Sequence, residues 1–429
     1  MFAGKHKVCI VGMGEFSDFF IPLFKSHPDV EEVSIADIVE ERCLAAAKKH
    51  GIVRMFRSLD DFIQNGKDID CVAIFTQRQL HGGMVVDCLK AGKHVFSAVP
   101  MATSEEEIAQ IIDLVKTTRL TYMTGETCYY FPCAVYCRDI YRRGLLGKFV
   151  YGESQYYHDM STFYYAFEHS GGKDWKKVAG IPPMYYGTHS ISMIVSVIGE
   201  HVKKVSCMGY RDHNEDEVFG IGKNYWDNPF SNETALMEMS GGGIARVNEF
   251  RRVGIAEKPS SYITCLYGEK AAYEASVTQH AFIHGTTEGK ENTYIKYVSD
   301  LVNTKTYTKV KNSPEFDVNR YPISEPAHRG FAPIQDISRL PIAFRSTPDT
   351  VHYNSHPFLV DDFFRAVVSG KLPPNNAWDS ARYMLPGLKA HESALKDGMP
   401  VAVPDFGDAP KDWERIAFEK KDYYETLEP

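Results

Sequence analysis

The segment that decides the fold is Lys7 to Ser17, with the sequence KVCIVGMGEFS. It begins with an apolar run that ends at Val11 and predicts a β-strand. The glycines that follow form a G-x-G-x-x-S variant of the Rossmann fingerprint. Gly12 allows the tight turn, and Gly14 lets backbone N–H groups approach a pyrophosphate. Ser17 replaces the third glycine, so we expect strand and helix to lie slightly farther apart than usual.

A carboxylate at the end of the second apolar run supports a dinucleotide site. Asp37 follows Val33 to Ala36, about 20 residues after the glycine loop, where an acidic side chain accepts hydrogen bonds from the adenosine ribose. No basic residue stands beside Asp37 to receive a 2′-phosphate, so the sequence predicts NAD rather than NADP. Glu15 and Phe16 are expected beside the cofactor. The alternative is an aspartate that only caps a turn.

Residues 7–125 alternate strand-like runs with helical patterns, which is typical of βαβ units and a parallel sheet. The clearest helix follows Ser104 and Glu107, which form a capping box. Its apolar residues share one face. We therefore predict a Rossmann domain over residues 1–125, whose further strands are Asp70 to Phe75, His94 to Ser97 and Thr121 to Thr124.

Hairpin patterns replace this alternation after Glu126. Ala235 to Met239 and Ile244 to Phe250 flank three glycines, and Phe149 to His158 alternates as a strand. These patterns predict a second α/β domain over 126–355, with a large, mostly antiparallel open sheet. We expect helices on one sheet face and ligand contact on the other. Within this domain, residues 275–350 suit a long loop, a lid or an oligomer contact. After it, residues 356–429 are expected to form a helical part that packs on or bridges both domains.

The composition is that of an ordinary globular protein. Its 429 residues are 44% hydrophobic and 24% charged, and the net charge of −8 comes without any basic block for phosphates, so nucleic acid is not expected as a partner. No apolar run approaches the roughly 20 residues of a membrane span. The N-terminal residues lack the pattern of a secretory signal. These features predict a cytoplasmic protein.

The cysteines and histidines offer weak metal patterns. The nine cysteines are odd in number and scattered, so we expect reduced, packed thiols rather than disulfides. Cys128, Cys133 and Cys137 form one cluster, without a second ligand pair at finger-like spacing. His158 and Asp159 are two potential ligands without a third. We predict no required metal.

Further landmarks resemble the Gfo/Idh/MocA oxidoreductase family over nearly the whole chain. They are Ile74 to His81 (IFTQRQLH), Ala91 to Ser97 (AGKHVFS) and Tyr186 to His189 (YGTH), together with the glycine loop and Asp37. The resemblance implies a Rossmann domain, an open-faced α/β domain and a homo-oligomer. The loop after the Cys71 to Phe75 strand is expected to line the cofactor through Thr76, Gln77 and His81.

Two departures from the family pattern bear on the chemistry. Family dehydrogenases carry Glu-Lys-Pro where this sequence has Ala98-Val99-Pro100, and their lysine assists proton transfer from the alcohol. The family also places an aspartate at the position that is Tyr185 here. The lysine-based mechanism therefore does not carry over.

A narrower resemblance is to glycoside hydrolase family 109. It rests on Gly125 to Tyr130 (GETCYY), Tyr151 to Asp159 (YGESQYYHD) and the Tyr186 segment, although the spacing between the second and third segments is shorter here. In that family the reaction is oxidation of a sugar hydroxyl by bound NAD, elimination of the aglycone, water addition and return of the hydride. The resemblance places four residues in the active site: Glu126, Tyr156, Tyr186 and His189.

These residues suggest roles on a carbohydrate or glycoside. His189 is the candidate base, on a helix that Thr188 is expected to cap. Tyr156 is the candidate proton donor, although the two residues can exchange duties. Tyr130 and Arg251 are candidate substrate contacts. Arg251 and its charged neighbours bind sugar hydroxyls or a carboxylate, or else form a solvated edge.

Three functions remain open. The first is redox-assisted glycoside cleavage by an NAD-dependent enzyme. The second is a conventional sugar or cyclitol dehydrogenase in which His189 replaces the lysine that is missing at Val99. The third is a catalytically silent NAD-binding sensor. Net reduction of the cofactor distinguishes the second from the first.

Overall fold

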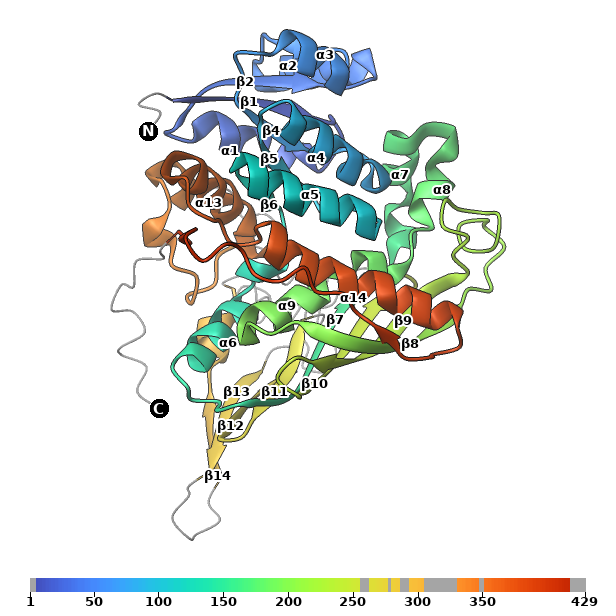
Figure 1. Ribbon diagram of the computed structural model, residues 1–429, viewed down its shortest axis with the longest axis vertical. Coiled ribbons are helices and arrows are strands. Elements are labelled where there is room, and N and C mark those ends of the chain that lie inside the picture. Colours follow the sequence, from blue (N-terminus) through green and yellow to red (C-terminus); the bar gives the residue numbers. More distant parts are fainter. Residues whose placement is uncertain are drawn as a thin grey trace, which may run out of the picture.

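The protein is described by a computed structural model, which covers residues 5–254, 262–276, 279–285, 293–304, 330–346 and 351–416. Figure 1 shows two sheets, one above the other, with a long helix lying between them. The upper sheet is built from the N-terminal residues and the lower one from the middle of the chain. The α/β fold class expected from the sequence is confirmed.

The upper sheet is a six-stranded parallel sheet in the order β3-β2-β1-β4-β5-β6. This is the strand order of a dinucleotide-binding Rossmann fold. All four residues of β4, Cys71–Ile74, are buried, as expected for a strand with helices on both faces. The predicted strands are confirmed, with small shifts at their ends. The other strands are β1 (His6–Val11), β2 (Val30–Ala36), β3 (Met55–Phe56), β5 (His94–Ser97) and β6 (Tyr122–Thr124).

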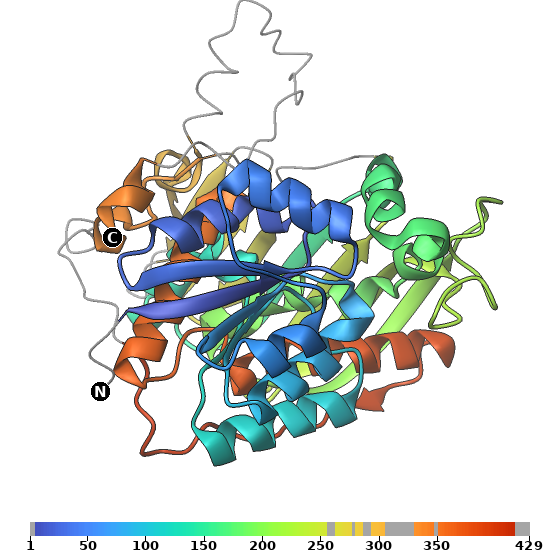
Figure 2. The same cartoon turned by 90° about the horizontal axis from the view of Figure 1, so that it is seen from above.

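Helices cover both faces of this sheet (Figure 2). The predicted capping box is confirmed in part, because Ser104 accepts a hydrogen bond from the Glu107 N–H at 3.2 Å. The helix after the glycine loop differs from the expected one. A short 3-10 helix at Ser17–Phe19 comes first, and α1 has only six residues, with Pro22 in its first turn. The helices are α1 (Ile21–Ser26), α2 (Glu40–His50), α3 (Leu59–Asn65), α4 (His81–Lys90) and α5 (Glu105–Thr118).

The lower sheet has nine strands in the order β14-β13-β12-β11-β7-β10-β9-β8-β15. It is antiparallel except for the β7–β10 pair. The hairpin of β9 and β10 is confirmed. The strands are β7 (Phe149–Tyr157), β8 (Val202–Arg211), β9 (Phe230–Met239), β10 (Ile244–Phe250), β11 (Ile263–Gly268), β12 (Ala271–Ala275), β13 (His280–Gly285), β14 (Thr293–Tyr297) and β15 (Val401–Ala402).

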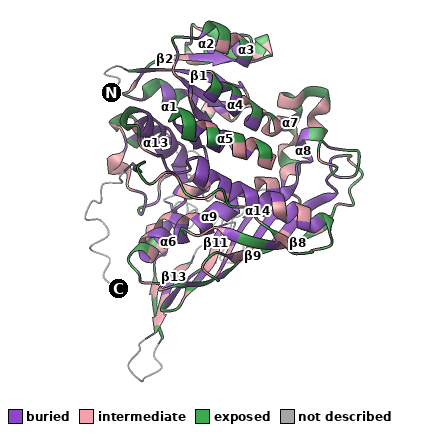
Figure 3. Cartoon of the chain, in the orientation of Figure 1, coloured by how far each residue is buried: buried purple, intermediate pink, exposed green. Residues whose placement is uncertain are grey.

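One face of this sheet is covered by helices that separate it from the Rossmann domain (Figure 3). The helix α9 packs on β7, where Ser154 donates a hydrogen bond to the Ser190 carbonyl at 2.6 Å. Tyr156 points to the same face as Ser154. The expectation that ligand contacts use the other face is wrong, because the candidate residues lie on the covered face. The covering helices include α6 (Pro132–Arg142) and α9 (Thr188–Ile198), and this part of the chain also forms α7 (Tyr164–Gly171), α8 (Trp175–Ala179) and α10 (Ser299–Val302).

The C-terminal helices contact both halves of the molecule. The helix α13 (Ser355–Ser369) places Phe363 and Phe364 in the core beside β1. The helix α14 (Ala377–Leu395) contacts α5 and β6 on one side and α9 and β8 on the other. A shared helix of this kind couples the packing of the two sheets.

Residues 275–350 fall partly outside the described residues, so the long-loop expectation is only partly visible. Within them, β13 and β14 extend the lower sheet, and the short helix α12 spans Ile342–Arg345. Eight of the nine cysteines are buried, as expected for packed thiols, and Cys265 is partly exposed. Across the described part of the chain, no helix combines the length and apolar character that a membrane crossing requires.

Candidate active site

A buried carboxylate–imidazole pair joins the two domains. Glu126 follows the end of β6, where ligands approach a parallel sheet, and His189 lies in the first turn of α9. The His189 Nδ1 and the Glu126 Oε1 are 2.7 Å apart. Glu126 is 0% exposed and His189 is 4% exposed. The two residues therefore form a hydrogen-bonded dyad that is shielded from water.

Glu126 is held as a carboxylate. Although burial acts against it, the attraction of His189 and three hydrogen bonds keep the pKa of Glu126 below its ordinary value. The bonds come from His189, from the Thr188 hydroxyl and from the Cys128 N–H at 2.9 Å. The Glu126 carboxylate accepts a hydrogen bond from the Nδ1 side of His189, so Nε2 is the ring nitrogen left for proton transfer. Thr188 does not cap α9 as expected, because its hydroxyl binds Glu126 instead.

Two tyrosines lie against the His189 ring, as the resemblance implied. The Tyr156 ring is 4.8 Å from it and the Tyr186 ring is 5.1 Å from it, measured between centroids. The Tyr156 hydroxyl lies 3.3 Å from the Nδ1 of His158. Burial lowers the pKa of His158 to about 3, so this ring is neutral and can accept the Tyr156 proton. His158, which the sequence offered only as a metal ligand, is thus part of the site.

Two arginines complete this cluster. The guanidinium of Arg251 lies 4.3 Å from the Tyr186 ring centroid and 5.2 Å from that of Tyr156. Arg78 lies 4.7 Å from the Tyr186 ring and donates to its hydroxyl at 3.2 Å. Sequence reasoning gave Arg78 no role. Its place in the loop after β4 was the available signal, since that loop opens at the same edge as Glu126.

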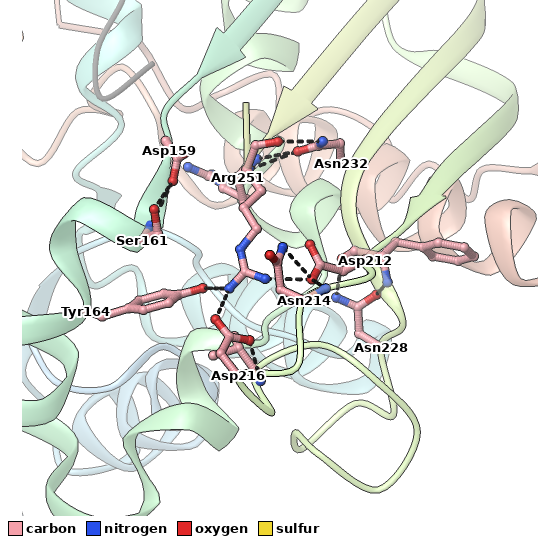
Figure 4. A network of polar contacts seen from close by, with 12 residues as sticks. Asp159, Ser161, Tyr164, Asp212, Asn214, Asp216, Asn228, Asn232 and Arg251 are labelled. Carbon is pink, nitrogen blue, oxygen red and sulfur yellow. Dashed lines mark hydrogen bonds and ion pairs between the residues drawn. The ribbon is translucent and has the colours of Figure 1, made fainter. Parts of the chain in front are cut away.

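The end of β10, which carries Arg251, is fixed by a polar network (Figure 4). The Asn232 Oδ1 accepts the backbone N–H of Arg251 at 2.9 Å. Figure 4 shows Tyr164, Asp212 and Asp216 converging on one guanidinium, which belongs to Arg252. Arg252 thereby joins the β8–β9 connection to α7.

The glycine loop has the shape that a pyrophosphate site needs. Gly12 has a φ of 97°, and a Cβ there would meet the Phe75 carbonyl oxygen at 2.7 Å. A Cβ at Gly14 would have nothing within 4 Å. Asp37 is buried and accepts the Met13 N–H at 2.7 Å, so it also holds the loop in place. This open backbone beside a carboxylate fits a dinucleotide.

The other loop residues lie around this position. Ser17 is buried and donates to the Gly14 carbonyl at 2.7 Å, which closes the turn in place of a third glycine. Glu15 is exposed and Phe16 is half-buried. The Phe16 ring packs edge-on against Phe75 and Phe20. Phe16 therefore anchors the loop to the sheet.

The loop after β4 has a buried anchor. Thr76 and Gln77 are partly exposed at the end of the strand. The His81 ring nitrogens lie 2.8 Å from the Pro100 carbonyl and 3.0 Å from the Thr76 carbonyl. Burial lowers the pKa of His81, and a neutral ring can donate to only one of these two carbonyls at a time. Val99 is 7% exposed, and an apolar side chain occupies the position of the family lysine.

Tyr130 does not reach the site. Its hydroxyl donates to Asp362 on α13 at 2.7 Å, and its ring stacks on Phe358. Burial raises the pKa of Tyr130 well above its ordinary value. The prediction that Tyr130 contacts substrate is wrong, because α13 draws its side chain into the interdomain core.

Three potential metal ligands meet at the dyad. Glu126, Cys128 and His189 offer ligand atoms that lie within 4.8 Å of one another. The direct contact of 2.7 Å between Glu126 and His189 leaves no space for an ion between those two atoms. The expectation that no metal is required stays a prediction.

Comparison with known proteins identifies the upper domain. Residues 6–126 match the model of a family described as "Oxidoreductase family, NAD-binding Rossmann fold". Over these residues the chain is similar to this family. The match ends at Glu126, the carboxylate of the dyad; Arg78 also lies within it, and the other residues of the cluster come from later in the chain. The NAD-binding assignment made from the glycine loop is confirmed at the level of the family.

Relatives extend the likeness to the second domain. A glycosyl hydrolase family 109 protein of Streptomyces filamentosus is 22% identical over 93% of this chain and 77% of its own length. An alpha-N-acetylgalactosaminidase of Bacteroides fragilis is 33% identical, but over only 31% of this chain and 32% of that protein. A levoglucosan dehydrogenase solved with NADH and levoglucosan has the same fold, with a TM-score of 0.69 and 17% identity over 94% of this chain and 100% of that one.

Proposed function

We propose that the protein is an NAD-dependent enzyme that cleaves a glycoside by transient oxidation of the sugar. The observation that carries the proposal is the Glu126–His189 pair beside Tyr156, in a chain where Val99 stands in place of the family lysine. A substrate at the edge of the NAD-binding sheet would lie against these three side chains. The likeness to glycosyl hydrolase family 109 supports the same reaction.

The chain supplies proton transfer and orientation. Glu126 fixes the His189 tautomer, so that Nε2 can accept the proton of a sugar hydroxyl or of the neighbouring C–H. Tyr156 can give a proton to the leaving oxygen, and the Nδ1 of His158 lies 3.3 Å from its hydroxyl. Tyr186 and Arg78 would hold the sugar from the partly exposed side of the cluster. The burial of the dyad keeps competing water away from the proton-transfer step.

The cofactor fits the residues of the glycine loop. When bound, NAD would accept a hydride from the substrate and return it at the end of the cycle. Gly12 and Gly14 give the pyrophosphate room, and Asp37 would receive the ribose hydroxyls. A buried carboxylate repels a 2′-phosphate, so we propose NAD rather than NADP. Five further residues are proposed to line the cofactor through loop contacts or positioning: Glu15, Phe16, Thr76, Gln77 and His81.

A conventional sugar dehydrogenase is the second candidate. The fold shared with a levoglucosan dehydrogenase over 94% of this chain favours it. In that case His189 alone would take the hydroxyl proton. The third candidate, a silent sensor, fits the loss of the lysine but leaves the buried Glu126–His189 pair without a use.

The deciding experiment is turnover of nitrophenyl glycosides by the purified full-length protein with NAD. Nitrophenol release and NADH absorbance are followed in the same sample. Release without net NADH supports cleavage, whereas net NADH on free sugars would replace the proposal with the dehydrogenase. Full nitrophenol release by His189→Ala would contradict the role of the dyad.

Three further predictions accompany this function. A homo-oligomer, a cytoplasmic location and the domain limits at 125 and 355 all remain untested expectations. Size-exclusion chromatography with light scattering would measure the oligomeric state directly.

A further inference from the structure

One guanidinium of the site is buried with an unused hydrogen-bond donor. Arg251 is 3% exposed, and its Nη2 lies 3.2 Å from the Glu249 Oε2. Among the residues that the structure describes, no hydrogen-bond partner lies at its Nη1. An unpaired donor on a buried charged group is costly, so a ligand atom that accepts from this position would be favoured.

A second cation lies across the same aromatic ring. The guanidinium groups of Arg78 and Arg251 are 4.7 and 4.3 Å from the Tyr186 centroid. Within the described part of the chain, Arg78 donates to the Tyr186 hydroxyl and forms no ion pair with a carboxylate. Two cations near one ring repel each other, and an anion that lies close to both would offset this repulsion.

The neighbouring carboxylates do not cancel this positive charge. Burial raises the pKa of Glu249 to about 8, despite the attraction of Arg251, so Glu249 is largely protonated at neutral pH. Glu126 is already engaged by His189 and Thr188. The Arg251 side of the site therefore has an excess of positive charge beside a proton-transfer dyad.

We propose that Arg251, with Arg78, binds a carboxylate of the substrate, so that the sugar belongs to the uronic acid class. A planar guanidinium with a spare N–H matches a carboxylate oxygen in charge and geometry. This inference rests on the proposed function only in placing a carbohydrate here. A neutral hydroxyl could also accept from Nη1, but it would leave both cations without a counter-charge.

The arrangement is preorganised for an anion. The backbone N–H of Arg251 is fixed by Asn232 at the end of β10, and the Tyr186 ring faces its guanidinium (Figure 4 shows the Asn232 contact). Tyr186, Arg78 and His158 are partly exposed, so a ligand can reach the cluster from that side. Binding a carboxylate then requires little reorganisation, which favours affinity.

Calorimetry on the NAD-loaded full-length protein tests the proposal. The probes are the methyl glycosides of glucuronic and galacturonic acid, their neutral glucose and galactose parents, and the uronamides, at neutral pH. We expect one acid to bind at least about tenfold more tightly than its parent and its amide. Arg251→Gln should weaken the binding of that acid by about tenfold or more and change the affinity for the neutral parent by less than about threefold. Arg251→Lys should keep part of the preference for the acid.

Matched variants keep a folding defect from obscuring the result. Glu249→Gln changes the side chain that contacts Arg251 without removing the cation, so the acid should bind as tightly as in the wild type or more tightly. Melting temperatures with NAD identify any variant that fails to fold. The proposal is overturned if no acid binds more tightly than its neutral parent and its amide. It is also overturned if Arg251→Gln and Arg251→Lys weaken the binding of the acid and of its parent equally.

Failure of this inference differs from failure of the proposed function. Cleavage of neutral nitrophenyl glycosides, with no preference for acids, keeps the function and removes the carboxylate site. A preference for acids with net NADH formation keeps the carboxylate site and replaces glycoside cleavage with dehydrogenation. Binding alone therefore decides the substrate class, whichever reaction follows.

Discussion

The charge of Glu126 matters because no water can replace it. The carboxylate is 0% exposed and holds the Nδ1 side of His189. Glu126→Gln keeps the shape but removes the anion that fixes the His189 tautomer, so we expect kcat to fall by about 10²–10⁴-fold. Turnover of the best nitrophenyl glycoside measures the loss, and calorimetry should show that NAD still binds.

A second buried pair provides a matched control for Glu126. Glu233 and His391 are also 2.7 Å apart, and Glu233 is 1% exposed, but this pair joins β9 to α14 rather than facing Tyr156. Glu233→Gln should lower the free energy of unfolding without a comparable loss of kcat per folded molecule. Equal losses of kcat in both variants would mean that Glu126 acts only through stability.

The protonation of Glu249 gives a pH dependence with a definite sign. Its pKa is about 8 in the folded protein because of burial, against an ordinary value of 4.5. Between these values the folded state keeps a proton that the unfolded state has lost. The free energy of unfolding should therefore fall as pH rises, by up to about 1.4 kcal/mol per pH unit.

Comparison with Glu249→Gln isolates this effect. His158 titrates in the opposite sense, since burial lowers its folded pKa to about 3, and its contribution is lost as pH falls below 6.5. Subtracting the variant's denaturation curves from those of the wild type cancels that contribution. Parallel curves from acid to alkaline pH would show that Glu249 is ionised in the folded protein.

At the scale of an element, the loop after β1 separates folding from cofactor binding. A Cβ at Gly14 meets nothing within 4 Å, whereas one at Gly12 would lie 2.7 Å from the Phe75 carbonyl. Gly14→Asp should leave the melting temperature nearly unchanged. It should weaken NAD binding by at least about tenfold, because it places an anion against the pyrophosphate. Calorimetry measures the affinity.

The neighbouring glycine is the control for that result. Gly12→Ala combines a φ of 97° with the backbone contact, so it should lower the melting temperature itself. Undiminished NAD affinity in folded Gly14→Asp would rule out this loop as the pyrophosphate site.

Helices, strands and turns were predictable from the sequence where the residues that determine them are close together in the chain. The glycine loop, the Ser104 cap and the β9–β10 hairpin depend on residues close together in sequence, and all three appear in the structure. The Pro22-containing start of α1 was missed because the apolar pattern continues through the 3-10 turn. Periodicity shows which face is buried but does not show where the first α-helical turn begins.

At the scale of the whole molecule, contacts distant in sequence decided what could not be predicted. His189 and Glu126 are 63 residues apart, and only the family resemblance brought them into one site. Tyr130 was misplaced because its partner, Asp362, lies 232 residues away on α13. The unpaired Nη1 of Arg251 also has no local signature, because burial and partners depend on the packed structure.

The two sheets should unfold together because α14 packs on both. Leu385 lies in the core with the Rossmann helices, whereas Tyr383 and Ala390 lie in the core of the lower sheet. Calorimetry should therefore show one cooperative transition, and NAD at about 100 times its Kd should raise the stability of that single transition by about 2.7 kcal/mol. Leu385→Ala should lower its midpoint through a cavity that costs about 2–5 kcal/mol, without splitting it. Two separate transitions, of which NAD shifts only one, would show that α14 does not couple the domains and that one sheet can unfold while the other stays folded.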